Sequence, residues 1–358
     1  MISRRGYPAI MTTMKEIAKL AGVHVTTVSL VLSGQDKKYG ISTARSEEIR
    51  SIAERLGYRR NAAALAINRG RFGTIGLVMG HRWSLGHLPR PMLNGISMGL
   101  GERGLQLLFA QLPDEEALRA ETVPRLLRER SCDGLLISYD EGSPIVLNQL
   151  IQRYSVPAIW MNLRREADCV HPDDFGSGRA ATEFLLAMGH RRIAYSNFYW
   201  SGATEAQLLD AHYSMRDRRD GCLSILERAG LTPLPGLVQM GEDQSSAATA
   251  SAAERLLRRP DRPTAVICFS LGDAEGLMIA ANTLGLSIPG DLSLICFGPE
   301  PIRILGLELS TMIVPVHQVG YRAVTQLQRR IAAPTLPLPP EVVPGELQRG
   351  ASCAAPAA

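Results

Sequence analysis

Short hydroxyl-bearing and basic side chains gather near the N-terminus of this 358-residue chain. They are Thr26, Thr27, Ser29, Lys37, Lys38 and Ser42. Hydroxyl groups can bond base edges and phosphate oxygens, and ammonium groups neutralise phosphates. The grouping therefore indicates a surface that binds nucleic acid. Elsewhere in the chain we find no nucleophile–base motif or phosphate loop, so the sequence does not predict an enzyme.

Two short helices would position these groups. Apolar residues repeat at helical spacing as far as Gly22, which predicts that a first helix stops there. A second helix is expected to begin near Val25, with hydroxyls on one side and Val28 and Val31 on the other. Two short helices joined by a tight glycine-containing turn form a helix-turn-helix, whose second helix enters the DNA major groove.

The predicted head carries the positive charge of the chain. Residues 1–72 hold 13 Lys and Arg against five Asp and Glu, whereas the other 286 residues hold 26 against 30. A basic head on a mildly acidic body is what phosphate neutralisation by one domain requires. A third helix over residues 43–56, capped by Ser42 and ended by Gly57, would complete the head.

The sequence also argues against a membrane-spanning or secreted protein. No run approaches the roughly 18 apolar residues that a membrane-spanning helix needs, and the N-terminus lacks a signal-peptide pattern. We therefore expect a cytoplasmic protein with no membrane partner. The six cysteines show no paired spacing, so we expect reduced, mostly buried thiols and no structural metal.

Residues 99–104 fit the dinucleotide fingerprint GxGxxG. That fingerprint must follow a strand and open a helix, so that the helix N-terminus meets the pyrophosphate. Here the glycines end a predicted helix and precede a predicted strand. We therefore expect no nicotinamide cofactor, and no other cofactor is indicated.

From Gly73 the pattern changes to alternating strands and helices. Apolar strand-like runs occupy 74–79, 105–109, 134–138, 158–161, 192–196, 265–269 and 292–297. Helical stretches occupy 92–103, 115–129, 178–188 and 217–229. Short β-rich runs that alternate with helices imply parallel sheets covered on both faces.

The stretch MKEIAKLAGVHVTTVSLVLSG at 14–34 resembles the start of the lac/gal repressor family of bacterial transcription regulators, with its signature DVAxxAGVSxxTVSRVLN. The phrases GHRRIA (189–194), PTAVICF (263–269), GLSIPGDLSLICF (285–297) and LSTMIVP (309–315) follow in the family's order. The resemblance implies an N-terminal all-α helix-turn-helix DNA-binding domain plus an α/β periplasmic-binding-protein-like regulatory domain of two parallel-sheet subdomains.

The resemblance also implies domain boundaries. Residues 1–13 would be a disordered N-terminal extension and 14–59 the DNA-binding domain. Residues 60–72 would form a hinge helix and linker, 73–352 the effector-binding and dimerisation domain, and 353–358 a tail. The tail lacks leucine heptads, so a homodimer is expected rather than a tetramer.

Operator contacts follow from the resemblance. The recognition helix would reach base edges through Val25, Thr26, Ser29 and Leu30, where many relatives carry Arg in place of Leu30. Phosphates would be met by Thr27, Lys37, Lys38, Ser42 and Asn61. The hinge would present Asn61, Ala64 and Ile67, with Ile67 wedged between base pairs in the minor groove. The family's hinge proline is replaced by Arg60, and a merely helical Ala-rich linker is the alternative.

The resemblance places a small-molecule effector in the cleft between the subdomains. Its predicted contacts are Trp83, His87, Trp160, Asp173, Trp200, Arg218, Ser270 and Asp273. Arg218, three residues before Gly221, matches the family's RxxGF arginine; a surface arginine is the alternative. The tryptophans could stack on a sugar or sugar derivative, or simply pack at the subdomain edge. The family's Asn-Asp pair after 263–269 is replaced by Ser270 and Leu271.

These patterns predict a sequence-specific transcription regulator, a repressor whose affinity for double-stranded operator DNA changes when an effector binds. The alternative is a solute-binding protein of the periplasmic-binding fold without operator activity. The basic head favours the first interpretation.

Overall fold

The computed structural model describes residues 12–60, 70–80, 88–112, 131–139, 145–237 and 245–357, together with residues 129 and 243. The chain divides into two compact units, Met1–Phe72 and Gly73–Ala358. The hinge residues Asn61, Ala64 and Ile67 lie outside the described residues, so their contacts stay predictions. Most of the helix predicted at 115–129 lies outside them too.

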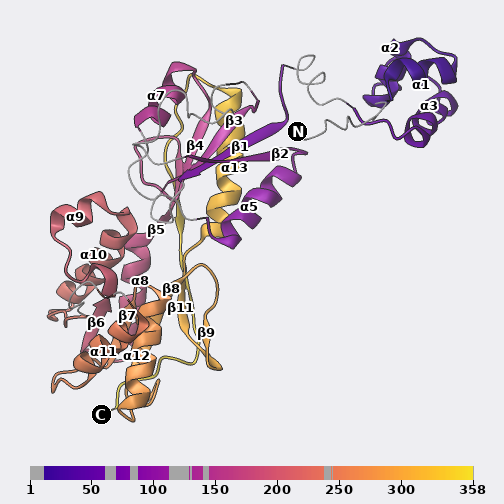
Figure 1. Cartoon of the computed structure of the whole chain (residues 1–358). Coiled ribbons are helices and arrows are strands. Elements are labelled where there is room, and N and C mark those ends of the chain that lie inside the picture. The colour runs from indigo at the N-terminus through magenta and orange to yellow at the C-terminus, as the bar shows by residue number, and fades with distance from the viewer. Residues whose placement is uncertain are drawn as a thin grey trace, which may run out of the picture. The chain divides into compact units, whose positions relative to one another are not determined.

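Three helices form the first unit (Figure 1): α1 (Met14–Ala21), α2 (Val25–Leu32) and α3 (Thr43–Arg55). Thr13 and Glu16 form a capping box at the start of α1, which satisfies backbone N–H groups that the first turn leaves unpaired. Gly22 ends α1 at φ 61°, a left-handed conformation that glycine adopts at no steric cost. Ser42 caps α3 as predicted.

Apolar side chains from all three helices close the core of this unit. Ile17, Val28 and Ile49 are fully buried, and Val31 is almost so. Burying such side chains stabilises the fold by about 1.5–3 kcal/mol each. An ion pair of 2.8 Å between Arg50 and Asp36 ties the loop after α2 to α3.

A six-stranded parallel sheet begins the second unit, in the order β12-β5-β4-β3-β1-β2. Its strands are β1 (Thr74–Gly80), β2 (Gln106–Leu112), β3 (Gly134–Ser138), β4 (Ala158–Met161), β5 (Cys169–Asp173) and β12 (Glu341–Pro344). Helices α5 (Arg90–Gly101) and α13 (Val316–Ala332) pack on one face, and α7 (Ile145–Arg153) packs on the other. The predicted strands at 74–79, 134–138 and 158–161 are confirmed as β1, β3 and β4.

A second sheet has the order β13-β11-β8-β7-β6, with only β13 antiparallel to its neighbour. Its strands are β6 (Ile193–Ser196), β7 (Ala265–Cys268), β8 (Ser293–Gly298), β11 (Ser310–Ile313) and β13 (Glu346–Gln348). Helices α8 (Asp174–Ala187) and α10 (Tyr213–Arg228) cover one face, and α11 (Ser246–Leu257) and α12 (Leu271–Thr283) cover the other. Smaller elements are η3 (Phe198–Trp200), α9 (Glu205–Asp210), β9 (Arg303–Ile304) and β10 (Leu307–Glu308).

The chain crosses between the two sheets three times. The crossings lie between β5 and α8, between β11 and α13, and at Gly345 between β12 and β13. A Cβ atom at Gly345 would lie 2.5 Å from Oγ of Ser177 and 2.9 Å from the carbonyl of Ile313, so only glycine fits where the crossings meet. These crossings confirm the predicted two-subdomain regulatory fold.

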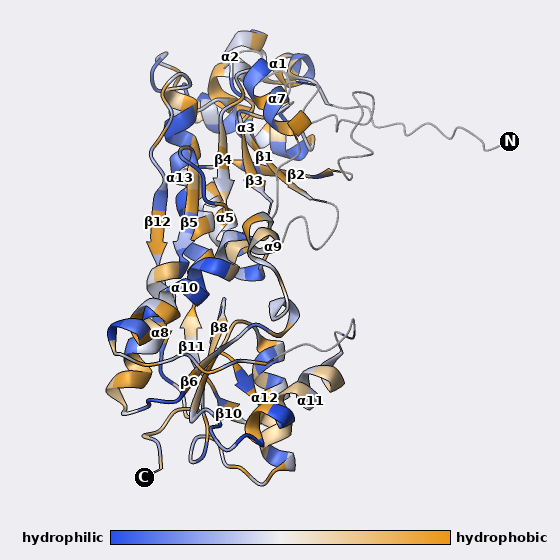
Figure 2. Cartoon of the chain, turned by 90° about the vertical axis from the view of Figure 1, so that its left-hand side faces the viewer, coloured by the Kyte–Doolittle hydropathy of each residue, from blue (hydrophilic) through white to orange (hydrophobic). Residues whose placement is uncertain are grey.

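Helices α8 and α10 begin about four residues before their predicted starts. Asp173 and His212 cap them, and neither residue was part of the predicted helices. Strands such as β1 and β3 are coloured as apolar in Figure 2, as expected where both faces are covered. The described helices include none that is both long and apolar enough to cross a bilayer. Gly101 ends α5 before β2, which confirms the order that excluded a dinucleotide site.

Candidate functional site

Helix α2 divides its side chains between core and solvent. Val28 is fully buried against α1 and α3, whereas Thr26 and Ser29 are exposed. Val25, Thr27 and Leu30 are half-buried along the boundary between these faces. The exposed face thus offers hydroxyl groups without a charged side chain, which suits base edges more than phosphates.

Basic side chains flank that helix. Lys37 and Lys38 are exposed in the loop after α2, and the Lys38 ammonium lies 5.7 Å from the centre of the Tyr39 ring. Ser42 is exposed, but its hydroxyl accepts the backbone N–H of Arg45. His24 was not predicted as a site residue, yet its Nδ1 lies 2.9 Å from Oγ1 of Thr26 at the start of α2. A polar N-cap directly before a recognition helix was the pattern that could have identified it.

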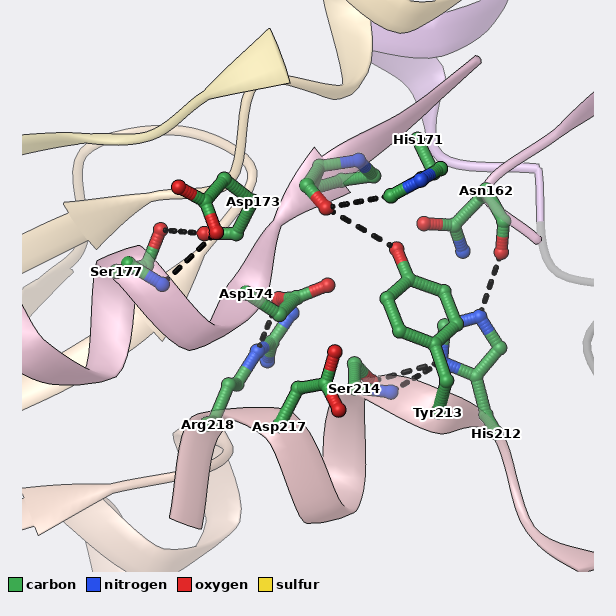
Figure 3. Close-up of polar contacts among 12 residues, drawn as sticks. Asn162, His171, Asp173, Asp174, Ser177, His212, Tyr213, Ser214, Asp217 and Arg218 are labelled. Carbon is green, nitrogen blue, oxygen red and sulfur yellow. Dashed lines mark hydrogen bonds and ion pairs between the residues drawn. The ribbon is translucent and has the colours of Figure 1, made fainter. Parts of the chain in front are cut away.

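The second unit holds a buried ion pair where α8 and α10 meet. Nε of Arg218 donates to Oδ1 of Asp174 over 2.6 Å, and the two side chains are 11% and 1% exposed. Figure 3 shows the two side chains pointing at each other from neighbouring helices. Burial alone would lower the pKa of Arg218, but Asp174 more than offsets this and raises it. Arg218 therefore carries its positive charge in this pair.

Two glycines bring these helices close enough to form the pair. A Cβ atom at Gly178 of α8 would run into the backbone carbonyl of Arg218 in α10. A Cβ atom at Gly221 of α10 would run into the carbonyl of Phe175 in α8. The RxxG spacing of Arg218 and Gly221 thus has a packing reason, because it puts the arginine one turn before the point of closest approach.

Two aromatic rings lie close to the Arg218 guanidinium. Its central carbon lies 4.9 Å from the centre of the Phe269 ring and 4.5 Å from that of Phe297. Phe269 follows β7 and Phe297 is in β8, so both rings mark the carboxyl ends of adjacent strands. Ligands of open α/β sheets bind at this edge. A planar guanidinium stacks well on such rings while its N–H groups stay in the plane.

Three buried polar atoms near this edge have no hydrogen-bond partner among the described residues. They are Oδ2 of Asp174, the hydroxyl of Tyr195 and Oδ1 of Asn197. Tyr195 is in β6 and Asn197 follows it, so strand alternation puts both on the face that α10 covers. Burial raises the pKa of Tyr195 well above its usual value, which keeps the hydroxyl protonated. Because native proteins rarely leave buried polar atoms unpaired, these three atoms are available to a bound water or ligand.

The start of α10 also contacts the first subdomain. His212 accepts the Ser214 backbone N–H at Nδ1, and its Nε2 lies 2.6 Å from the carbonyl oxygen of Asn162, after β4. Burial lowers the pKa of His212, which favours the neutral ring that these bonds need. Arg164 forms a 2.7 Å ion pair with Asp217. Figure 3 shows the contacts of His212 with Asn162 and Ser214 beside the Arg218 pair.

Only some predicted effector residues lie in this cluster. Arg218 is at its centre, and Asp173 is beside it, but the Asp173 carboxylate accepts the Gly176 N–H and caps α8. Trp200 is half-buried in η3, after Asn197. Trp83 and His87 lie outside the described residues.

Ser270 and Asp273 have a structural role that the prediction missed. They form the capping box of α12, and Asp273 is fully buried. Its Oδ1 accepts from Ser196 and Phe198, and its Oδ2 accepts from Ser270. Both oxygens are thus occupied by the protein, so Asp273 does not offer an effector a free acceptor. The S-x-x-D spacing was the sequence pattern of this cap.

Trp160 must also be corrected. It is 4% exposed and packs with Leu135, Ile137 and Leu147 on the face of the first sheet that α7 covers. Its ring lies under Arg165, 4.4 Å from the guanidinium carbon. A position at a strand end was a poor guide, because side chains alternate between the two faces.

Comparisons with known proteins agree with this two-part architecture. Residues 13–61 match the family described as bacterial regulatory proteins, lacI family. Residues 182–353 match the periplasmic binding protein-like domain.

Relatives match along nearly the whole chain. The HTH-type transcriptional repressor PurR of Vibrio vulnificus (strain CMCP6) is 26% identical over 90% of this chain and 92% of its own length. The ribose operon repressor of Escherichia coli (strain K12) is 28% identical over 91% of this chain and 95% of its own length. Among solved structures, the lac repressor dimer bound to operator and the anti-inducer ONPF has a TM-score of 0.76 at 21% identity. It covers 96% of this chain and 99% of its own.

Proposed function

This chain belongs to the lacI family of bacterial regulatory proteins, and we propose that it is a transcription repressor whose operator affinity is set by a small effector. It acts as a binding protein rather than an enzyme, and in the cytoplasm, where bacterial DNA lies. The solute-binding alternative does not account for the match of residues 13–61 to a regulatory head.

The observation that carries the proposal is the division of α2 into a packed face and a hydroxyl-bearing face. Val28 and Val31 fix the helix in the head, so Thr26 and Ser29 are held outward on a rigid element. Leu30 lies half-buried at the edge, where it can contact a thymine methyl but cannot read guanine as arginine does. Lys37 and Lys38 supply phosphate contacts, and the hinge residues Asn61, Ala64 and Ile67 supply the minor-groove contacts.

The effector site is the cluster around Arg218. Two of its unpaired buried atoms, Oδ2 of Asp174 and Oδ1 of Asn197, are acceptors. An effector that satisfies them must carry hydrogen-bond donors, as the hydroxyl groups of a sugar or sugar derivative do. The Tyr195 hydroxyl can donate to or accept from the same molecule. Closure of the subdomains on it would alter the Asn162–His212 and Arg164–Asp217 contacts.

Dimerisation would use an exposed apolar surface on the first subdomain. Leu93 and Met98 of α5 are 39% and 46% exposed, and Leu108 and Phe109 of β2 are 39% and 49% exposed. Phe109 has the strand parity of Leu107, which packs on the side of the sheet that α5 covers, so Phe109 can share a surface with α5, whereas Leu108 lies on the other face. Large exposed apolar groups in a soluble protein mark interaction surfaces. A second copy on this face would present two heads to the two halves of a palindromic site.

The test is a selection of genomic fragments by the purified full-length chain, followed by a salt titration of the best fragment. A palindromic site bound far more tightly than bulk DNA is the expected result. Titration of sugars against the complex then identifies the effector, because an effector that changes operator affinity must itself bind with altered affinity in the presence of DNA. Enrichment no better than that of random fragments, with and without sugars, would contradict the proposal.

A further inference from the structure

A hollow of about 680 Å³ opens on the first subdomain between α7, the loop 165–168 and the segment after α13. Ala158 and Trp160 of β4 line it together with Ile151 and Val156. None of the residues that line it belongs to the Arg218 cluster. Its volume is in the range of small-molecule pockets, and polar or charged side chains line it alongside the apolar ones.

Two arginines line this hollow, and they differ in whether a carboxylate pairs with them. Nε of Arg330 lies 3.1 Å from Oδ2 of Asp168, whose Oδ1 also accepts the backbone N–H of Leu338. These bonds hold Arg330 in place and neutralise its charge. Arg330 therefore lines the hollow in a fixed position, and its charge is already paired with Asp168 and not available to a ligand.

Arg165 has no such partner. Within the described part of the chain it makes no ion pair, and its guanidinium lies 4.4 Å above the Trp160 ring. Partial burial lowers the pKa of this guanidinium, as expected for a cation that has lost water on one side. A guanidinium with one face on an aromatic ring still directs its N–H groups outward in a planar fork. That fork matches a carboxylate or a phosphate.

We propose that this hollow is a second small-molecule site, one that takes a small organic anion. The single carboxylate or phosphate of the anion pairs with Arg165, and its apolar body contacts Ile151 and Val156. Glu166 also lines the hollow and limits the positive potential there, so a ligand with one anionic group fits better than one with several. The site is separate from the effector cluster and does not depend on the function proposed for it.

The loop that carries Arg165 also contacts α10. The Asn162 carbonyl bonds His212, and Arg164, the residue next to Arg165, pairs with Asp217. A ligand that draws Arg165 into the hollow therefore acts on the segment that joins the first subdomain to α10.

Isothermal titration of the full chain with four probes tests the proposal: benzoate, phenyl phosphate, benzylamine and inorganic phosphate. We expect one equivalent of benzoate or phenyl phosphate to bind. Benzylamine should not bind because it has the opposite charge, and inorganic phosphate should not bind because it has no organic body. Arg165→Gln should weaken the binding about tenfold or more, as expected for the loss of a charge-assisted hydrogen bond.

Arg153→Gln is the matched control, because Arg153 stacks on Tyr154 at 5.6 Å on the same subdomain but does not line the hollow. It should leave the affinity unchanged. Gln152→Glu puts a second negative charge beside the bound anion. It should weaken binding of the anion without lowering the thermal unfolding midpoint. Three outcomes would each overturn the proposal: no binding of either organic anion, equal binding of benzylamine, or unchanged affinity in Arg165→Gln.

Discussion

The recognition helix and the Arg218 cluster present their polar groups in opposite ways. Thr26 and Ser29 of α2 are exposed, and the unit that carries them is held together by apolar packing. Arg218 and Asp174 are buried, and they are held by each other and by two glycines. A surface that meets a large polyanion can leave its groups in water until binding. A site that must surround a small molecule has to keep its groups dry and preorganised.

The largest expected effect comes from breaking the buried pair. Arg218→Met leaves the Asp174 carboxylate buried without a cation, which should lower the free energy of unfolding by about 3–5 kcal/mol. Chemical denaturation of the full chain measures it. Arg258→Met is the control: Arg258 pairs with Glu254 at 2.6 Å, but its side chain is 62% exposed, so the loss should stay below about 1 kcal/mol. Equal losses of unfolding free energy in the two variants would show that the buried ion pair contributes no more to stability than the exposed one.

A smaller loss is expected when the two helices are pushed apart. Gly178→Ala drives a methyl group into the Arg218 carbonyl, which should cost about 1–3 kcal/mol of stability and weaken effector binding. Gly101→Ala in α5 meets no atom within 4 Å and should be neutral or slightly stabilising. Denaturation of both variants tests this, and a neutral Gly178→Ala would show that the approach of α8 and α10 is not tight.

Substitutions on the head should leave folding intact and change DNA binding. Ser29→Ala should cost about 1 kcal/mol at one base pair of the operator, whereas Lys38→Ala should weaken all sequences alike and reduce the salt slope by about one. Binding isotherms on operator and mutated operator at several salt concentrations separate the two. Loss of thermal stability in Ser29→Ala would contradict the exposed position of its side chain.

The smallest effect is a pH dependence confined to the regulatory unit. Burial lowers the pKa of both His190 and His212 from the usual 6.5. The unfolded chain therefore takes up protons first as pH falls below about 6.5. Stability from these rings is fully present above that pH and is lost as pH falls through the lowered pKa values. Unfolding midpoints between pH 5 and pH 8 measure it, and His212→Gln should flatten the slope. A midpoint that rises on acidification would contradict the assignment.

Local sequence patterns predicted much of this structure. The helix-turn-helix, the cap at Ser42 and strands such as β1 and β3 depend on spacing and capping within a few residues, so they were readable in advance. Arg218 was found by its distance from Gly221. Tyr195 and Asn197 were missed because an unpaired buried atom becomes visible only when its neighbours are known.

The errors at Trp160 and Asp273 have the same origin. Both were assigned to the cleft because they lie near strand ends. Trp160 faces α7 because strand parity puts it on the other side of the sheet. Asp273 has both oxygens taken by the cap of α12 and by the turn after β6. The position of a residue in the sequence can place it near a strand end. Its contacts in the folded chain decide which of its atoms remain free to bind a ligand.

The sequence by itself determined the resemblance to the lacI family through its motifs. It also determined the basic head, the recognition helix and the parallel strand pattern, because each of these depends on periodicity, charge or local capping. Only the tertiary structure decided which polar atoms are left unpaired. The Arg218–Asp174 pair joins residues 44 apart, and Arg165 meets Trp160 where the chain folds back over β4. Such contacts arise from packing between elements, and the free energy of a buried charge depends on its neighbours in space.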